Sequence, residues 1–234
     1  MNFRVLRNIA FLFVFVSGLA IVFGAAWTSG AGSPSLSERF ELLPEEKKVP
    51  KAERSGEYSF DKAHSSIGFR IKHMGLIDVP GHFRKFEGGL EFDASKSRNS
   101  SVSFTADMKS IDTGINARDN HLRSKDFFEV KTYPAMKFES TRIKKKGKRY
   151  FVKGNLTMKD VTKEIEFPVR IYGPIRDQRG TIRMGVSGTT SINRREFNVN
   201  YGGNLPGGTA VLADNVFVDL RIEAVKKKDE KEKK

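Results

Sequence analysis

The chain has 234 residues, of which 42 are Lys or Arg and 28 are Asp or Glu, so its formal net charge is +14. It contains no cysteine, which excludes a disulfide framework, a thiol nucleophile and lipid attachment through a cysteine. The positive charge favours anionic lipids or acidic amphiphiles as partners. We expect no nucleic-acid partner, because the sequence carries no signature of a nucleic-acid-binding module.

The first 26 residues have the pattern of an export signal. Arg4 and Arg7 precede an apolar run over 9–27, and small residues occupy 24–26. A basic start, an apolar middle and a small-residue end predict a cleaved signal peptide, with cleavage after Ala26. The apolar run also approaches the roughly 20 residues that span a bilayer, so an uncleaved anchor is the alternative. Both readings predict a periplasmic protein, with membrane association through this segment in the second case.

Two polar segments flank the predicted domain at 57–226. Residues 27–56 are rich in Ser, Gly, Pro and charge and have few apolar residues, which is typical of a flexible linker. Residues 227–234 are all charged and predict a disordered tail.

Apolar and polar residues alternate along most of the domain. Val102, Phe104, Ala106 and Met108, for example, are separated by polar residues. A period of two is typical of half-buried strands, which belong to antiparallel sheets. With no long helical pattern between the strands, the domain is predicted to be all-β, a sandwich or a closed barrel. The expected strands cover about 58–71, 83–92, 100–111, 135–143, 149–158, 162–172, 181–192 and 215–225.

Three local signals refine this prediction. The apolar parity changes near Lys85, which indicates a β-bulge. Tight hairpin turns are expected at 146–148 and at 159–160. Small residues on the apolar faces are expected to leave room inside the sheet; these are Gly88, Ala106, Gly154 and Gly188.

The segment 116–125 departs from the alternation and predicts a short helix. Asn116 is a suitable N-cap, and Asp119 follows three residues later, near the positive end of the helix. Phe127 and Phe128 come directly after the helix. We expect the helix to lie across one open end of a barrel.

No pattern of catalytic residues is present. The sequence has no Gly-x-Ser-x-Gly, no phosphate-binding glycine loop and no dinucleotide fingerprint. The four histidines, at 64, 73, 82 and 121, match no zinc-site spacing. We therefore predict no catalytic residues, no metal site and no cofactor, and we expect a binding protein and not an enzyme.

Five motifs in order resemble the YceI-like family over about residues 57–226. They are Asp61–Phe69 with His73-Met74-Gly75, Gly81–Gly88, Arg118–Phe128 with Tyr133-Pro134, Gly154–Thr157 with Val161-Thr162-Lys163, and Ile192-Asn193-Arg194 with Phe197. The resemblance implies a lipocalin-like barrel of eight antiparallel strands, usually periplasmic, that binds a polyisoprenoid or another long amphiphile inside. The Gly-rich segment 202–208 departs from the family pattern and is expected to shape the barrel mouth.

The parity of the strands assigns candidate lipid-binding residues to the barrel interior. These are Phe69, Ile71, Phe86, Leu90, Phe92, Phe104, Met108, Phe127, Phe128, Phe138, Leu156, Ile165, Phe167, Met184, Val186 and Leu220. A core filled by these side chains is the alternative, because an eight-stranded barrel is only just wide enough to hold one small ligand.

The cations of the short helix are candidates for binding a lipid head group. Arg118, His121 and Arg123 fall on this helix, where they would make charge-assisted contacts with an anionic group at the mouth. The alternative is a solvated helix face.

The predicted function is therefore to hold or carry an isoprenoid-like lipid outside the cytoplasm. The alternatives are a lipid-modifying enzyme and a stress-related structural protein, and the sequence leaves the oligomeric state open.

Overall fold

The computed structural model describes residues 49–228, in which eleven strands, one α-helix and four short 3-10 helices occur. The predicted signal or anchor at 1–26, most of the predicted linker and residues 229–234 lie outside the described residues. The strands are β1 (Gly56–Phe60), β2 (Ser66–His73), β3 (Ile77–Phe83), β4 (Phe86–Phe92), β5 (Ser101–Asp107), β6 (Ile111–Asp112), β7 (Ala135–Lys146), β8 (Arg149–Met158), β9 (Val161–Arg176), β10 (Ile182–Asn193) and β11 (Leu212–Lys226). The helices are η2 (Lys51–Glu53), η3 (Ser97–Asn99), η4 (Met108–Ser110), α2 (Asn116–Arg123) and η5 (Arg194–Phe197).

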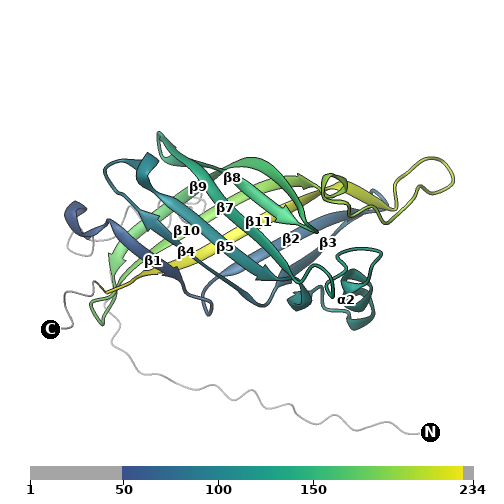
Figure 1. The fold of residues 1–234 in the computed structure, drawn as a ribbon, viewed down its shortest axis with the longest axis horizontal. Coiled ribbons are helices and arrows are strands. Elements are labelled where there is room, and N and C mark those ends of the chain that lie inside the picture. Colours follow the sequence, from purple (N-terminus) through teal and green to yellow (C-terminus); the bar gives the residue numbers. More distant parts are fainter. Residues whose placement is uncertain (1–48, 229–234) are drawn as a thin grey trace, which may run out of the picture. The chain divides into compact units, whose positions relative to one another are not determined.

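These strands fill eight positions of a closed antiparallel barrel (Figure 1), because three positions hold two consecutive strands each. β1 and β2 both pair with β11, through Phe60↔Ala224 and Ile67↔Leu220, so they follow one another along it. β4 and β3 pair with β1 and β2, and β5 and β6 pair with β4 and β3. Neighbouring strands from β7 to β11 complete the ring. The prediction of an eight-stranded lipocalin-like barrel is confirmed.

The parity change near Lys85 is a break between two strands and not the predicted bulge. β3 ends at Phe83 and β4 begins at Phe86. The Arg84 N–H donates to the carbonyl of Ser110 at 3.1 Å, and the Lys85 N–H donates to Ser110 Oγ at 2.9 Å. β3 pairs with β2 and β4 pairs with β1, so the chain changes partners here, and two residues lie between the strands where a bulge would add one.

The two predicted hairpins are present at the positions expected. Gly147 has a φ of +61° between β7 and β8. Lys159 and Asp160 have φ angles of +49° and +57° between β8 and β9. Positive φ at both central residues is the geometry of the turn that matches the twist of paired strands.

The helix α2 lies near the end of the barrel from which the loop before β11 projects (Figure 1). It begins at Asn116 and ends at Arg123, two residues before the predicted end. Asn116 is the first helical residue and not the N-cap, because Ile115 precedes the helix without a side-chain cap. Asp119 is 4% exposed and accepts hydrogen bonds from the N–H and hydroxyl of Thr113. Its carboxylate thereby ties the helix to Thr113, the residue that follows β6.

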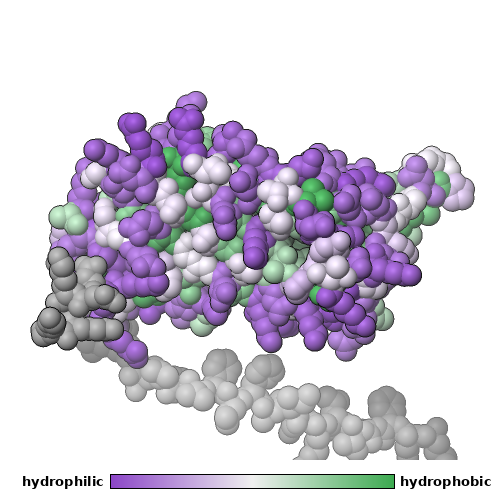
Figure 2. Space-filling view, in the orientation of Figure 1, coloured by the Kyte–Doolittle hydropathy of each residue, from purple (hydrophilic) through white to green (hydrophobic). Residues whose placement is uncertain are grey.

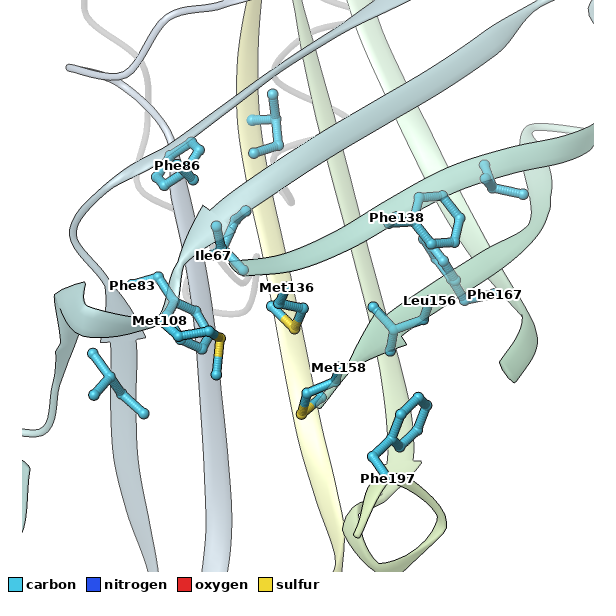
Figure 3. Packing of buried hydrophobic residues seen from close by; sticks show 14 of the residues in the cluster. Ile67, Phe83, Phe86, Met108, Met136, Phe138, Leu156, Met158, Phe167 and Phe197 are labelled. Carbon is cyan, nitrogen blue, oxygen red and sulfur yellow. The ribbon is translucent and has the colours of Figure 1, made fainter. Parts of the chain in front are cut away.

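Inward-facing side chains form two buried apolar clusters. The larger cluster includes Phe138, Leu156 and Met158 (Figure 3). The smaller cluster lies around Tyr58 and includes Val49, which is 1% exposed. The last part of the predicted linker therefore contacts the barrel, through Val49 and Arg54, whereas residues 50–53 are exposed. Burial raises the pKa of Tyr58 to about 12, and its hydroxyl donates to the Arg54 carbonyl at 2.6 Å.

The glycines of the apolar faces do not leave the room that the sequence suggested. A Cβ at Gly154 would lie 2.6 Å from Phe138 Cζ and 2.4 Å from the Glu139 carbonyl oxygen. A Cβ at Gly88 would lie 2.6 Å from a ring carbon of Phe60. Aromatic rings therefore occupy the space beside Gly154 and Gly88, as expected in an interior packed to crystal-like density.

The outer surface carries the polar half of the alternation, and Figure 2 shows hydrophilic residues over most of the visible face. Among residues 49–228, no helix has the length and apolar character needed to cross a membrane.

Arg183 is the centre of an ion cluster on the outside of the barrel. Its guanidinium lies 2.8 Å from Asp61, 2.8 Å from Asp177 and 2.7 Å from Glu223. Asp61 also bonds His64 at 3.0 Å. The cluster thereby connects the break between β1 and β2 to β10 and β11.

We expect this cluster to make the stability of the barrel depend on pH. The hydrogen bonds from His64 and Arg183 lower the pKa of Asp61 from 3.8 to about 2. A lowered carboxyl pKa stabilises the fold above the unfolded value, and this stability is lost as the pH falls from about 4 to about 2. The melting temperature should fall across this range, and Asp61→Asn should flatten the fall. Equal slopes for both proteins would contradict the assignment.

Candidate functional site

A cavity of about 430 Å³ occupies the barrel interior at the end next to α2. Its volume lies within the range of small-molecule sites, roughly 300–1,000 Å³. Its wall is predominantly apolar and comes from both sides of the barrel, from α2 and from the segments around η5. A second cavity of about 80 Å³ lies deeper, among residues of β1, β2, β4, β5 and of β7 to β11. The interior is therefore hollow in part, although a large core surrounds it.

Thirteen of the sixteen predicted interior residues line one or both cavities. Those at the larger cavity are Phe69, Ile71, Phe104, Phe127, Phe128, Phe138, Leu156, Ile165, Phe167 and Leu220. Those at the smaller cavity alone are Leu90, Phe92 and Val186. The remaining three, Phe86, Met108 and Met184, are buried in the apolar core away from both cavities.

Further lining residues were not among the sequence candidates. They include Ile67, Phe83, Met136, Met158, Ile192, Leu212, Val216 and Val218. Parity was the signal that would have found several of them, since Ile67 shares a face with Phe69, and Val216 and Val218 share a face with Leu220. Residues of the loops, such as Val199 and Val211, have no such periodic signal.

Arg118 is the helix cation that reaches the cavity wall. Its Nε donates to Thr113 Oγ1 and its Nη2 donates to the Thr113 carbonyl, both at 2.7 Å. These bonds hold the guanidinium in place, and within residues 49–228 no hydrogen bond engages its Nη1. The arrangement fits an anionic group at this end of the cavity.

His121 also lines the cavity and contacts two aromatic rings. Its ring centroid lies 5.0 Å from that of Phe127 and 4.7 Å from that of Tyr201, both edge-on. Its Nε2 lies 3.0 Å from a carboxylate oxygen of Asp126. These contacts join α2 to the loop after η5 and fix the position of the imidazole at the mouth.

Arg123 points away from the cavity and attaches α2 to the chain before it. Its Nε donates to the Lys109 carbonyl at 2.9 Å, and its Nη2 donates to the Ile111 carbonyl at 2.6 Å. Its Nη1 bonds Asn120 at 3.0 Å. Each nitrogen of its guanidinium is thus used within the protein, and Arg123 is not among the cavity-lining residues.

Arg194 is a lining cation that the sequence analysis did not select. It is 4% exposed and donates to the carbonyls of Val199 and Ala213 at 2.6 and 3.0 Å. Burial lowers its pKa. Its bonds to backbone oxygens give it a structural role at the mouth, where it holds the segment after η5 against β11.

Asp61, His64 and Glu223 are brought together although the sequence predicted no metal site. One ligand atom from each lies within 4.8 Å of the others. Arg183 Nη1 already contacts the carboxylates of Asp61 and Glu223. Its positive charge takes the position that a cation would need, so we assign these residues to the ion cluster of the fold.

The sequence matches the YceI-like domain over residues 58–224. The chain belongs to the YceI-like family. Among curated proteins, it is 39% identical over 135 residues to a UPF0312 protein of Photorhabdus laumondii, covering 58% of this chain and 70% of that protein. It is 34% identical over 177 residues to a UPF0312 protein of Pseudomonas putida, covering 74% and 88%.

Solved structures of other proteins share this fold. BcnA of Burkholderia cenocepacia is 28% identical with a TM-score of 0.62, covering 70% of this chain and 98% of that chain. The fold is also that of a polyisoprenoid binding domain from Saccharophagus degradans, with 17% identity, a TM-score of 0.56 and coverage of 73% and 98%. The barrel thus matches these two structures over nearly their whole length.

Proposed function

We propose that this YceI-like protein holds or carries a polyisoprenoid, or a similar long-chain amphiphile, in the barrel interior outside the cytoplasm. The observation that carries the proposal is the apolar cavity of about 430 Å³ whose wall next to α2 includes the Arg118 guanidinium and the His121 imidazole. An amphiphile matches this asymmetry, with its chain among the aromatic rings and its head group beside Arg118. The fold shared with a polyisoprenoid binding domain supports this class of ligand.

The wall of the larger cavity favours binding over catalysis. Its lining residues include no Asp, Glu, Ser or Cys among the described part of the chain. Acid–base or nucleophilic chemistry at this wall would have to rely on His, Thr or Tyr. The His121 imidazole already has Asp126 and the rings of Phe127 and Tyr201 as partners. The pattern of residues 1–26 supports a periplasmic location, where a carrier would shield an apolar chain from water.

The function is tested with farnesyl phosphate and delipidated protein. Native mass spectrometry should show one added ligand per protein, returned unchanged after denaturation. A free ligand concentration of about 100 times Kd should stabilise the fold by roughly 2.7 kcal/mol in thermal unfolding. An unchanged mass and melting curve would overturn the proposal. Recovery of a chemically altered lipid would identify an enzyme instead.

A further inference from the structure

The two cavities meet at one level of the barrel. Five residues line both of them, namely Ile67, Phe104, Phe138, Phe167 and Leu220. Phe104, Phe138 and Phe167 come from β5, β7 and β9, whereas Ile67 and Leu220 pair with one another on β2 and β11. These side chains therefore separate a large chamber at the mouth from a small chamber beyond it.

The three phenylalanines form a continuous group, which we term the aromatic septum. The rings of Phe104 and Phe138 stack with centroids 5.6 Å apart and an interplanar angle of 22°. The rings of Phe138 and Phe167 are 5.5 Å apart and tilted by 55°. Figure 3 shows Phe138 and Phe167 side by side, with Ile67 separated from them. Contacts of this kind stabilise ring pairs beyond the area that they bury.

The central ring of the septum is fixed by the barrel wall. Phe138 is 1% exposed. A Cβ added at Gly154 would lie only 2.6 Å from the Cζ atom of Phe138. The ring therefore occupies a space that exists because residue 154 has no side chain. Displacing it would require a new position in an interior that is already closely packed.

We propose that the aromatic septum limits the length of the lipid chain that this protein binds. The limit rests on the proposed lipid-binding function and concerns the same cavity. One water molecule takes up roughly 30 Å³ in the liquid, and we take this as the space for one heavy atom of the chain. The mouth chamber of about 430 Å³ then holds about 14 atoms, close to three five-carbon units. A longer chain would have to displace the septum or leave its end in water.

Phe138→Ala should open the way into the deeper chamber. The substitution removes six carbons, and the smaller chamber adds a further 80 Å³. At the same volume for each atom, the added space holds about nine more heavy atoms, or about two five-carbon units. The preferred ligand should therefore shift from about 15 carbons to about 25.

The test uses the full chain, delipidated, with an equimolar mixture of geraniol, farnesol, geranylgeraniol and geranylfarnesol. Native mass spectrometry gives the occupancy of each, and the uncharged prenols separate chain length from head-group contacts. The wild type should prefer farnesol, whereas Phe138→Ala should bind geranylfarnesol roughly tenfold better than farnesol, because more methylene groups are buried. Phe69→Ala is the matched control, since Phe69 lines the mouth chamber alone. Its loss removes the same six carbons but leaves the septum in place, so the preferred length should rise by no more than one five-carbon unit and should not reach that of geranylfarnesol.

Phe104→Ala provides a second route through the septum if Phe138→Ala does not fold. Phe104 is half-buried and lines both chambers, so its removal should produce a shift in the same direction. A wild type that binds all four prenols equally, or septum variants that keep the farnesol preference, would overturn the length limit and leave the proposed function standing. Failure of the wild type to bind any prenol or farnesyl phosphate would overturn both.

Discussion

Phe86→Ala is expected to lower the free energy of unfolding by about 3–5 kcal/mol. Phe86 is 7% exposed, belongs to the larger buried cluster and lines neither cavity. Its loss would leave a new void among packed side chains, with no ligand to fill it. The destabilisation should therefore be the same with and without bound lipid, as measured by urea unfolding of the delipidated and the lipid-loaded protein.

Phe69→Ala is the matched variant of the same residue type. Phe69 lines the mouth chamber and is half-buried, so part of its ring already faces empty space. We expect a smaller loss of stability than for Phe86→Ala in the absence of lipid, because fewer packing contacts are removed. The affinity for farnesyl phosphate should fall clearly. Equal losses of stability for the two variants, with unchanged lipid affinity, would show that both positions belong to a filled core.

Arg118→Gln is expected to weaken the binding of farnesyl phosphate by about 1.5–3 kcal/mol, the usual range for a hydrogen bond to a charged group. Glutamine is shorter and uncharged, so it cannot replace the forked donors of the guanidinium. The affinity for farnesol should barely change. The two dissociation constants, measured by calorimetry at one salt concentration, give the comparison directly.

Arg123→Gln is the control for the position of the helix. Arg123 bonds the carbonyls of Lys109 and Ile111 and does not line the cavity. Its loss should loosen α2 and weaken the binding of both lipids by similar factors. If Arg118→Gln also weakened both lipids in parallel, Arg118 would be part of the scaffold and not a contact of the head group.

The alternation of apolar and polar residues was sufficient to predict the class of fold and the inward face of most strands. Residues such as Phe138 and Leu156 face inward because successive side chains of a strand point to opposite sides of a sheet. The hairpin at Lys159–Asp160 was also predictable, since its turn depends on local backbone geometry. Parity does not distinguish a wall residue from a core residue, which is why Phe86, Met108 and Met184 were placed among the candidates.

The roles of Arg118 and Arg123 depended on contacts that the helical pattern does not contain. Both lie on the same short helix, yet Arg118 reaches the cavity wall and Arg123 is bonded to backbone carbonyls at 2.9 and 2.6 Å. The division of the interior by Phe104, Phe138 and Phe167 likewise arises between strands that are far apart along the chain. Local periodicity decides which face of a strand is buried. The space that remains inside depends on how side chains from opposite walls fill a closed volume, and this is settled when the barrel closes.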